Sequence, residues 1–283
     1  MLRQRFWMAM TLIALMPPTA GAHEFWISPS RYRASRGETV TVGGRVGTGF
    51  RGEQRPFAAE RVVRFVLIGR QPVDLGPAAM TGNVNWASFR LPDDLGAMVA
   101  YQSSFATIEL PAAQFDDYLR EEGLDAPLDA RRKLGMGAGP GRERYARCPK
   151  TWVAGRRDKG GAARSLRPAG LPLEIVPIAD PGGTNPLDIR VLWRGKPLAG
   201  ALLRAWRRPL APDWAPVAVA ARDSVGMALQ VRTDARGEAR LALAGDGEWL
   251  VSTVHMIPCA DKAVADWESW WASLTFARGP AGR

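Results

Sequence analysis

Short apolar runs separated by turn residues occupy the chain on both sides of its middle. Between His23 and Leu110, runs rich in Val, Ile, Phe and Trp alternate with Gly, Pro, Asn and Asp, and residues 39–42 alternate with period two. The same pattern resumes at Leu171. We therefore predict an all-β protein made of two β-sandwich domains. The predicted strands are 39–42, 62–68, 86–91, 98–103, 106–110, 173–178, 187–193, 201–206, 229–233, 239–243, 249–255 and 272–276.

A short helix and a linker are predicted between the two sandwiches. Pro111 is suited to the first turn of a helix, and Phe115, Tyr118 and Leu119 recur at helical spacing before Gly123 ends it. Residues 124–170 are rich in Gly and Arg and lose the regular pattern, although an extra strand over 144–153 would shelter its aromatic residues. The predicted domains are therefore 23–123 and 171–283, joined by the linker 124–170.

The second predicted domain carries turn motifs of a known type of sandwich. Residues 195–200 (GKPLAG) form a tight turn before a strand, 233–238 (TDARGE) form a second turn, and 247–251 (GEWLV) follow. Together they resemble the carboxypeptidase-regulatory or Cna-B type of domain, which is immunoglobulin-like or transthyretin-like. The resemblance implies a structural or binding element and says little about activity.

The first 22 residues have the three parts of a secretory signal peptide. Arg3 and Arg5 precede an apolar stretch over 6–16, and Ala20-Gly21-Ala22 supplies an A-x-A cleavage site. An uncleaved membrane anchor is the alternative, but the apolar stretch is short for a span. We expect a periplasmic protein whose mature chain begins at His23.

The expected export to the periplasm changes how the net charge and the two cysteines are interpreted. Lys and Arg number 38 against 28 Asp and Glu, which gives a net charge of +10. In an exported protein this charge favours anionic envelope surfaces or plain solvation, and we expect no nucleic-acid partner. Oxidising surroundings favour a disulfide between Cys148 and Cys259, with a thiolate metal ligand as the alternative.

The sequence offers little for catalysis. Only two histidines are present, and no G-x-S-x-G motif or other nucleophile setting accompanies either of them. The carboxylate pairs Asp93-Asp94 and Asp116-Asp117 are explained by a turn and a helix surface. We therefore predict that the protein is not an enzyme.

Metal binding is the sharpest chemical prediction. On cleavage His23 becomes the terminal residue, so that one residue offers both an α-amine of ordinarily low pKa and an imidazole. His255 ends a predicted strand and could add a third nitrogen, as in the histidine brace of certain periplasmic copper-binding sandwiches; Met256 and Glu24 are further candidates. The competing interpretation is that cleavage merely precedes a histidine and that His255 is an ordinary strand-end residue.

Tryptophans supply a non-enzymatic alternative. Eleven are present, and Trp267, Trp270 and Trp271 lie close together near the end of the chain, where they could stack on sugars in an envelope carbohydrate-binding or surface-binding module. Aromatic side chains also dominate the cores of small sandwiches, so we expect most of these tryptophans to be buried.

Five short motifs are spread along the chain: 22–27 (AHEFWI), 37–40 (GETV), 142–145 (RERY), 173–177 (LEIVP) and 270–276 (WWASLTF). Together they resemble one family of exported proteins of unknown function. Some of its members are described as NikK-like accessory components of nickel or cobalt uptake transporters. The resemblance therefore implies a periplasmic transition-metal accessory protein, with nickel or cobalt as the bound ion, copper as an alternative, and a membrane metal transporter or an outer-membrane receptor as partner.

Overall fold

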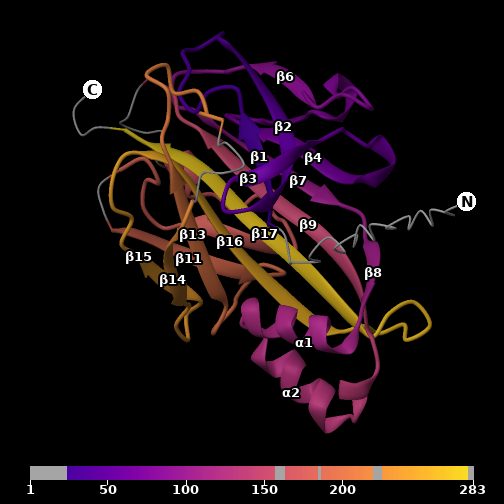
Figure 1. Cartoon of the computed structure of the whole chain (residues 1–283). Helices are drawn as coiled ribbons and strands as arrows, with labels where there is room; N and C mark the ends of the chain where they lie inside the picture. Colours follow the sequence, from indigo (N-terminus) through magenta and orange to yellow (C-terminus); the bar gives the residue numbers. More distant parts are fainter. Residues whose placement is uncertain (1–23, 157–162, 184–185, 219–224, 280–283) are drawn as a thin grey trace, which may run out of the picture.

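The computed structural model describes residues 24–156, 163–183, 186–218 and 225–279, and these residues form an all-β protein with two short α-helices (Figure 1). The predicted fold class is therefore confirmed. The predicted signal peptide, residues 1–22, lies outside the described residues. Among the described helices, none is long and apolar enough to cross a membrane.

A nine-stranded sheet forms the middle of the molecule. Its strands follow the order β14-β13-β16-β17-β9-β7-β4-β5, and β8 also pairs with β9. All neighbouring strands are antiparallel except β17 and β9, which are parallel. The strands are β4 (Val62–Ile68), β5 (Pro72–Asp74), β7 (Ala97–Ser103), β8 (Ala106–Leu110), β9 (Gly141–Val153), β13 (Leu202–Arg208), β14 (Met227–Arg232), β16 (Gly247–Pro258) and β17 (Trp267–Arg278).

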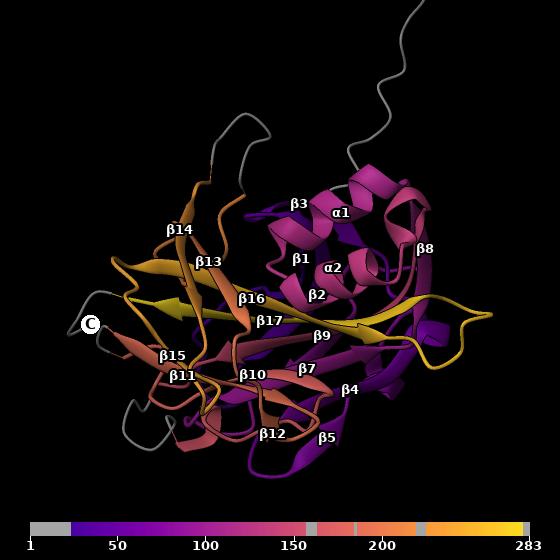
Figure 2. The ribbon, with the colours of Figure 1, turned by 90° about the horizontal axis from the view of Figure 1, so that it is seen from below.

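Two four-stranded sheets cover the nine-stranded sheet, one on each face, as Figure 2 shows from below. Ile27 and Val40 of the first sheet pack with Val99 and Val153 on one face, whereas Ile175 and other residues of the second pack with residues of β9 and β17 on the opposite face. The first sheet is β1 (Glu24–Pro29), β2 (Thr39–Thr48), β3 (Arg51–Arg55) and β6 (Ala87–Arg90); the second is β10 (Leu173–Pro177), β11 (Leu187–Trp193), β12 (Lys196–Pro197) and β15 (Glu238–Leu241).

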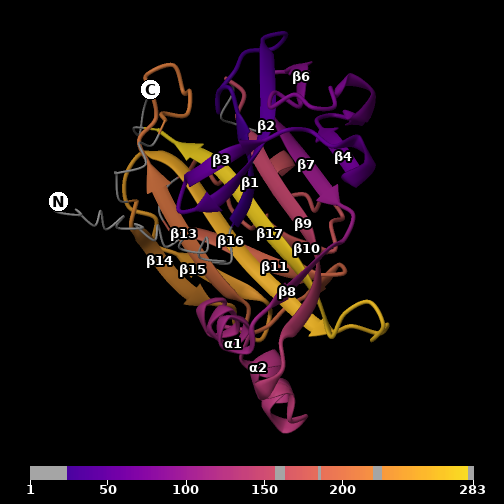
Figure 3. The ribbon, with the colours of Figure 1, turned by 45° about the vertical axis from the view of Figure 1, so that its right-hand side comes forward.

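The two α-helices lie together beside one end of the nine-stranded sheet (Figure 3). α1 (Ala112–Glu121) confirms the helix predicted after Pro111, and it buries Phe115, Tyr118 and Leu119 as the spacing requires. α2 (Asp125–Lys133) falls in the predicted linker, which also contains β9. Three 3-10 helices complete the described elements, at Ala59–Arg61, Gly76–Ala78 and Met136–Ala138.

Strand pairing unites the two predicted domains. β4, β7, β8 and β9 come from the first half of the chain, and β13, β14, β16 and β17 come from the second, yet all belong to the nine-stranded sheet. The link is the parallel pairing of β17 with β9, which runs from Trp267 opposite Glu143 to Thr275 opposite Thr151. The predicted boundary near residue 170 therefore does not separate two sheets.

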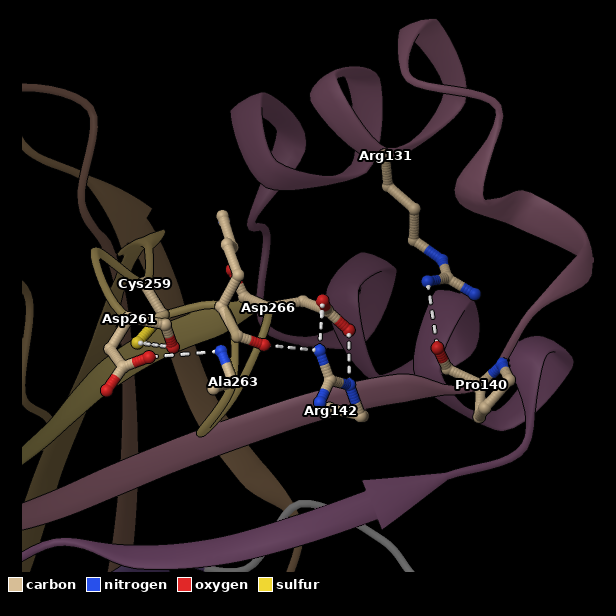
Figure 4. Close-up of polar contacts among 8 residues, drawn as sticks. Arg131, Pro140, Arg142, Cys259, Asp261, Ala263 and Asp266 are labelled. Carbon is tan, nitrogen blue, oxygen red and sulfur yellow. Dashed lines mark hydrogen bonds and ion pairs between the residues drawn. The ribbon is translucent and has the colours of Figure 1, made fainter.

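The expected disulfide is corrected by the structure, because Cys148 and Cys259 are both free and buried. Cys148 lies on β9, where its neighbour on β17 is Ala272. Cys259 directly follows Pro258, the last residue of β16, which pairs with Trp267 of β17. Trp267 in turn lies opposite Glu143 of β9. Five residues of β9 therefore separate the two positions, or about 16 Å, far beyond the roughly 7 Å limit for the Cα atoms of a disulfide. The Cys259 thiol instead donates to the Asp261 carbonyl at 3.3 Å (Figure 4).

Neither thiol is expected to react in the native protein. Both cysteines are 1% exposed, and burial raises the pKa of the Cys148 thiol to about 12, so that the reactive thiolate is scarce at neutral pH. Iodoacetamide followed by mass spectrometry should modify neither residue in buffer and both in denaturant without a reductant. Recovery of a linked Cys148–Cys259 peptide would contradict the structure.

Candidate functional site

A cluster of charged side chains, three of them buried and two partly buried, lies on the face of the nine-stranded sheet that β1 covers. It consists of Glu24, Glu122, Glu143, Arg147 and Arg204, and we call it the Glu24 cluster. Strand alternation explains its position: Ala146 and Cys148 of β9 and Leu203 and Ala205 of β13 pack toward the second four-stranded sheet, so the residues between them face β1. Three carboxylates and two guanidiniums are thereby collected from four elements.

The first described residue, Glu24, is placed by hydrogen bonds between β1 and β17. The Ser273 hydroxyl donates to the Phe25 carbonyl at 2.7 Å, and the Thr275 hydroxyl donates to the Ile27 carbonyl at 2.8 Å. Trp26 is fully buried with Phe50 and residues of β13 and β16. These contacts fix the start of β1 over the nine-stranded sheet.

Arg204 is shared by two buried carboxylates. Its Nη2 lies 3.3 Å from Glu24 Oε1 and also pairs with Glu122 Oε2, at the C-terminal end of α1. Among the described residues, none donates a hydrogen bond to either oxygen of Glu24 or to Oε1 of Glu122, although the two side chains are 1% and 2% exposed. Buried carboxylate oxygens are usually satisfied, so these oxygens are candidates for binding a cation.

The electrostatics of this pair follow from burial. Desolvation, with a smaller contribution from the neighbouring Glu122, raises the pKa of Glu24 to about 7 against the opposing charge of Arg204. Burial likewise raises the pKa of Glu122 against the opposing charges of Arg204 and Arg147. These positive charges do not offset the burial of both carboxylates, and the pair therefore holds a proton more readily than ordinary glutamates do.

Glu143 is held differently, by donors from α1 and β17. The Ser269 hydroxyl donates to Glu143 Oε1, and the Tyr118 hydroxyl donates to the same oxygen at 3.2 Å. The Trp271 indole N–H donates to the Ser269 hydroxyl at 3.2 Å. Burial raises the pKa of Glu143 to about 7 in spite of these donors.

The charge of Arg147 interacts with all three carboxylates, those of Glu24, Glu122 and Glu143. Its guanidinium stacks 4.8 Å from the ring centroid of Tyr145 and 4.6 Å from that of Trp271. Burial lowers the pKa of Arg147, while the charges of Glu143 and Glu24 raise it. The Glu24 cluster is therefore one electrostatic unit.

The second predicted metal ligand, His255, lies on the opposite face of the nine-stranded sheet from Glu24. It is half-buried, and its ring lies 4.8 Å from that of Trp193 on β11. Burial lowers the pKa of His255, and Arg194 lowers it further. Met256 points to the other face and is buried with residues of α1. His23 lies outside the described residues, but the structure does not bring His255 to the residue that follows it.

The described residues contain no group of three His, Cys, Asp or Glu side chains converging on one point as a metal would require. The carboxylates of Glu24 and Glu122 could supply two ligands to a cation, and further ligands would have to come from other residues. Trp267, Trp270 and Trp271 are 2%, 4% and 7% exposed, which confirms that these three belong to the core.

Sequence reasoning named Glu24 alone from this cluster. Glu122, Glu143, Arg147 and Arg204 were missed because charged residues in a helix end or in alternating strands usually face solvent. One signal of the cluster was present in the sequence. Glu143, Tyr145 and Arg147 stand at alternate positions, so in a strand the aromatic residue shares one face with the two charged residues.

Comparison with known proteins gives one family. A family model described as a domain of unknown function (DUF4198) matches residues 20–257, a range that includes all five residues of the Glu24 cluster. No curated protein matched the chain.

Proposed function

We propose, from the premise that the chain belongs to the DUF4198 family of domains of unknown function, that it is an exported accessory protein for nickel or cobalt uptake. In this proposal the mature chain begins at His23 and binds one divalent ion through the His23 amine and imidazole. The observation that carries the proposal concerns the next residue: Glu24 is 1% exposed, and neither of its carboxylate oxygens accepts a hydrogen bond from a described residue. A membrane metal transporter or an outer-membrane receptor is the proposed partner.

The chemistry of the Glu24 cluster suits a cation at the start of β1. Nickel and cobalt accept both nitrogen and carboxylate oxygen, and Glu24 and Glu122 present carboxylate oxygens of which one on each side chain pairs with Arg204. A divalent ion at this position would supply the positive charge that the two carboxylates lack. His255 is not part of the proposed ligand set, because it lies on the other face of the nine-stranded sheet.

The direct test is titration calorimetry of the mature protein with nickel, cobalt, copper and zinc. One equivalent of ion is expected to bind. One extra residue before His23 should abolish this binding, since the amine leaves its chelating position, and Glu24→Gln should weaken it by about tenfold or more.

His255→Gln is the matched control, because it removes the other histidine without touching the start of β1. Its affinity should equal that of the unmodified mature chain. Equal binding by the native and extended forms would refute the terminal chelate. A loss of metal binding in His255→Gln alone would show that the ion binds on the face of the nine-stranded sheet that carries His255.

Metal affinity is also expected to depend on pH. The α-amine and the imidazole must both be unprotonated to bind, and their ordinary pKa values are about 8 and 6.5. Affinity should therefore fall as the pH drops through roughly 7 to 5. Calorimetry at several pH values should show protons released on binding, and an affinity that is constant over this range would argue against the terminal amine as a ligand.

A further inference from the structure

A groove rich in arginine lies at the end of the nine-stranded sheet, beside the C-terminal end of β17. It forms where β13 ends, β16 begins and β17 ends, and the segment after β1 closes its side. Its volume is about 830 Å³. We call it the arginine groove; its charged lining residues are Arg31, Arg33, Arg156, Arg207, Arg278, Glu38, Asp213 and Asp246. It shares no residue with the Glu24 cluster.

Three arginines of this groove lack a carboxylate partner among the described residues. Several other arginines of the chain pair with carboxylates, as Arg142 does with Asp266 and Arg164 does with Asp93. Within the described part of the chain, Arg156, Arg207 and Arg278 form no such ion pair. The groove is therefore short of negative charge.

Arg278 shows this deficit most clearly. It is 5% exposed, and its guanidinium donates to the carbonyls of Leu243, at 2.9 Å, and Gly183. Burial lowers the pKa of Arg278, while Asp180 and Asp246 raise it from beyond ion-pair distance. A buried cation satisfied mainly by neutral carbonyls is costly unless an anion approaches it.

The acidic side chains of the groove mostly bind groups that lie close to them in the sequence. Glu38 pairs with Arg31 and also accepts from the Ser35 backbone N–H at 2.9 Å. Asp213 accepts from the Ala215 backbone N–H at 3.3 Å. Arg207 donates to the carbonyl oxygen of Asp246, at 2.7 Å.

The wall of the groove is held rigidly. Trp214 has a φ of 66°, a strained value for a tryptophan, and its loop is fixed by the bond from the Tyr32 N–H to the Trp214 carbonyl at 2.9 Å. The indole packs so closely on Gly279 that a Cβ there would lie 2.0 Å from the ring. The Arg33 guanidinium lies over the same ring, 5.3 Å from its centroid. Strain held at a surface loop is typical of binding sites.

We propose that the arginine groove binds a phosphomonoester. Among the described lining residues five arginines face three acidic residues, and Arg156, Arg207 and Arg278 form no ion pair with a described carboxylate. A phosphomonoester near neutral pH carries close to two negative charges, and its oxygens match guanidinium geometry. The groove has room for a sugar-sized group behind the phosphate. The phosphate could come from a soluble phosphorylated molecule or from a lipid headgroup.

The test uses calorimetry with glucose 6-phosphate as the soluble probe, and flotation with phosphatidylcholine vesicles with and without phosphatidic acid as the lipid probe. Saturable binding to either probe is expected, and the probe that binds identifies the source. Arg207→Gln and Arg156→Gln should each weaken binding by roughly tenfold, because each removes charge-assisted hydrogen bonds. Binding to neither probe would overturn the proposal.

Arg240→Gln is the matched control, since it removes the same charge from an exposed position on β15 that does not line the groove. It should bind as the wild type does; an equal loss in this variant would show a general charge effect and overturn the assignment. Glucose 6-sulfate, a monoanion, should bind at least tenfold more weakly than the phosphate, and equal affinity would overturn the assignment to a phosphomonoester.

Discussion

Glu174→Leu is expected to lower the free energy of unfolding by about 4–5 kcal/mol, because it leaves the Lys150 ammonium buried without a counter-charge. Lys150 Nζ donates to Glu174 Oε1 at 2.7 Å, and both side chains are 1% exposed. Glu174 also accepts from the backbone N–H groups of Ala169, Gly170 and Leu171. The substitution therefore leaves four hydrogen-bond donors without their acceptor at once. Urea unfolding followed by tryptophan fluorescence measures the loss in the free energy of unfolding.

Lys150→Met should cost less, about 3 kcal/mol, because Glu174 keeps its three backbone donors. Burial lowers the pKa of Lys150, so the ammonium is itself expensive to keep in the core. The control is Glu238→Gln, which breaks the partly exposed pairs with Arg190 and Arg236 and should cost under about 1 kcal/mol. A cost for Lys150→Met that equals or exceeds that of Glu174→Leu would contradict this account.

The positions of strands were predictable because hydrophobic alternation is local. The strands predicted over 62–68, 106–110 and 187–193 coincide with β4, β8 and β11, and α1 forms where Phe115 and its neighbours recur at helical spacing. Each of these patterns is decided by residues within one element. The fold class followed from them.

The pairing of strands was not predictable from the same patterns. The parallel pairing of β9 with β17 joins residues more than a hundred positions apart, and no turn sequence encodes it. Gly135, with a φ of 67°, and its glycine-rich neighbours suggested a linker, but they end α2 and lead directly into β9. A composition that looks like a domain boundary is here a connection inside one sheet.

The two covered faces also explain why charged residues were misjudged. In a sheet with one face in water, polar residues at alternate positions mark the solvated side. The nine-stranded sheet is covered on both faces, so Glu143, Lys150 and Arg204 occupy core positions in spite of their charge. Each is held by a partner distant in sequence, which a single sequence does not reveal.

The histidine prediction illustrates the same limit. His255 was paired with His23 because both are rare ligand types in this chain. Alternation along β16 sends His255 toward Trp193, whereas β1 lies across the other face. Which face a strand residue occupies depends on the strands above and below it, and those come from the tertiary fold.

The stability of the protein is expected to fall as the pH rises from about 4.5 to 7, with Glu143 contributing on the order of 3 kcal/mol over this range. Burial raises the pKa of Glu143 from 4.5 to about 7. Between these values the folded state keeps a proton that the unfolded state has lost, so each increase in pH favours unfolding. Above about pH 7 both states have lost the proton, and the contribution becomes constant.

The Glu143→Gln variant isolates this effect, because the amide cannot ionise and still accepts from Ser269 and Tyr118. Urea unfolding from pH 5 to 8 in the presence of EDTA should show the variant gaining on the wild type as the pH rises. Glu24 acts in the same direction, and His255, whose pKa is lowered, acts in the opposite one, but both are present in the two proteins and cancel in the comparison. Parallel stability curves would mean that Glu143 stays charged in the folded protein, and the hydroxyls of Ser269 and Tyr118 would then outweigh the cost of burial.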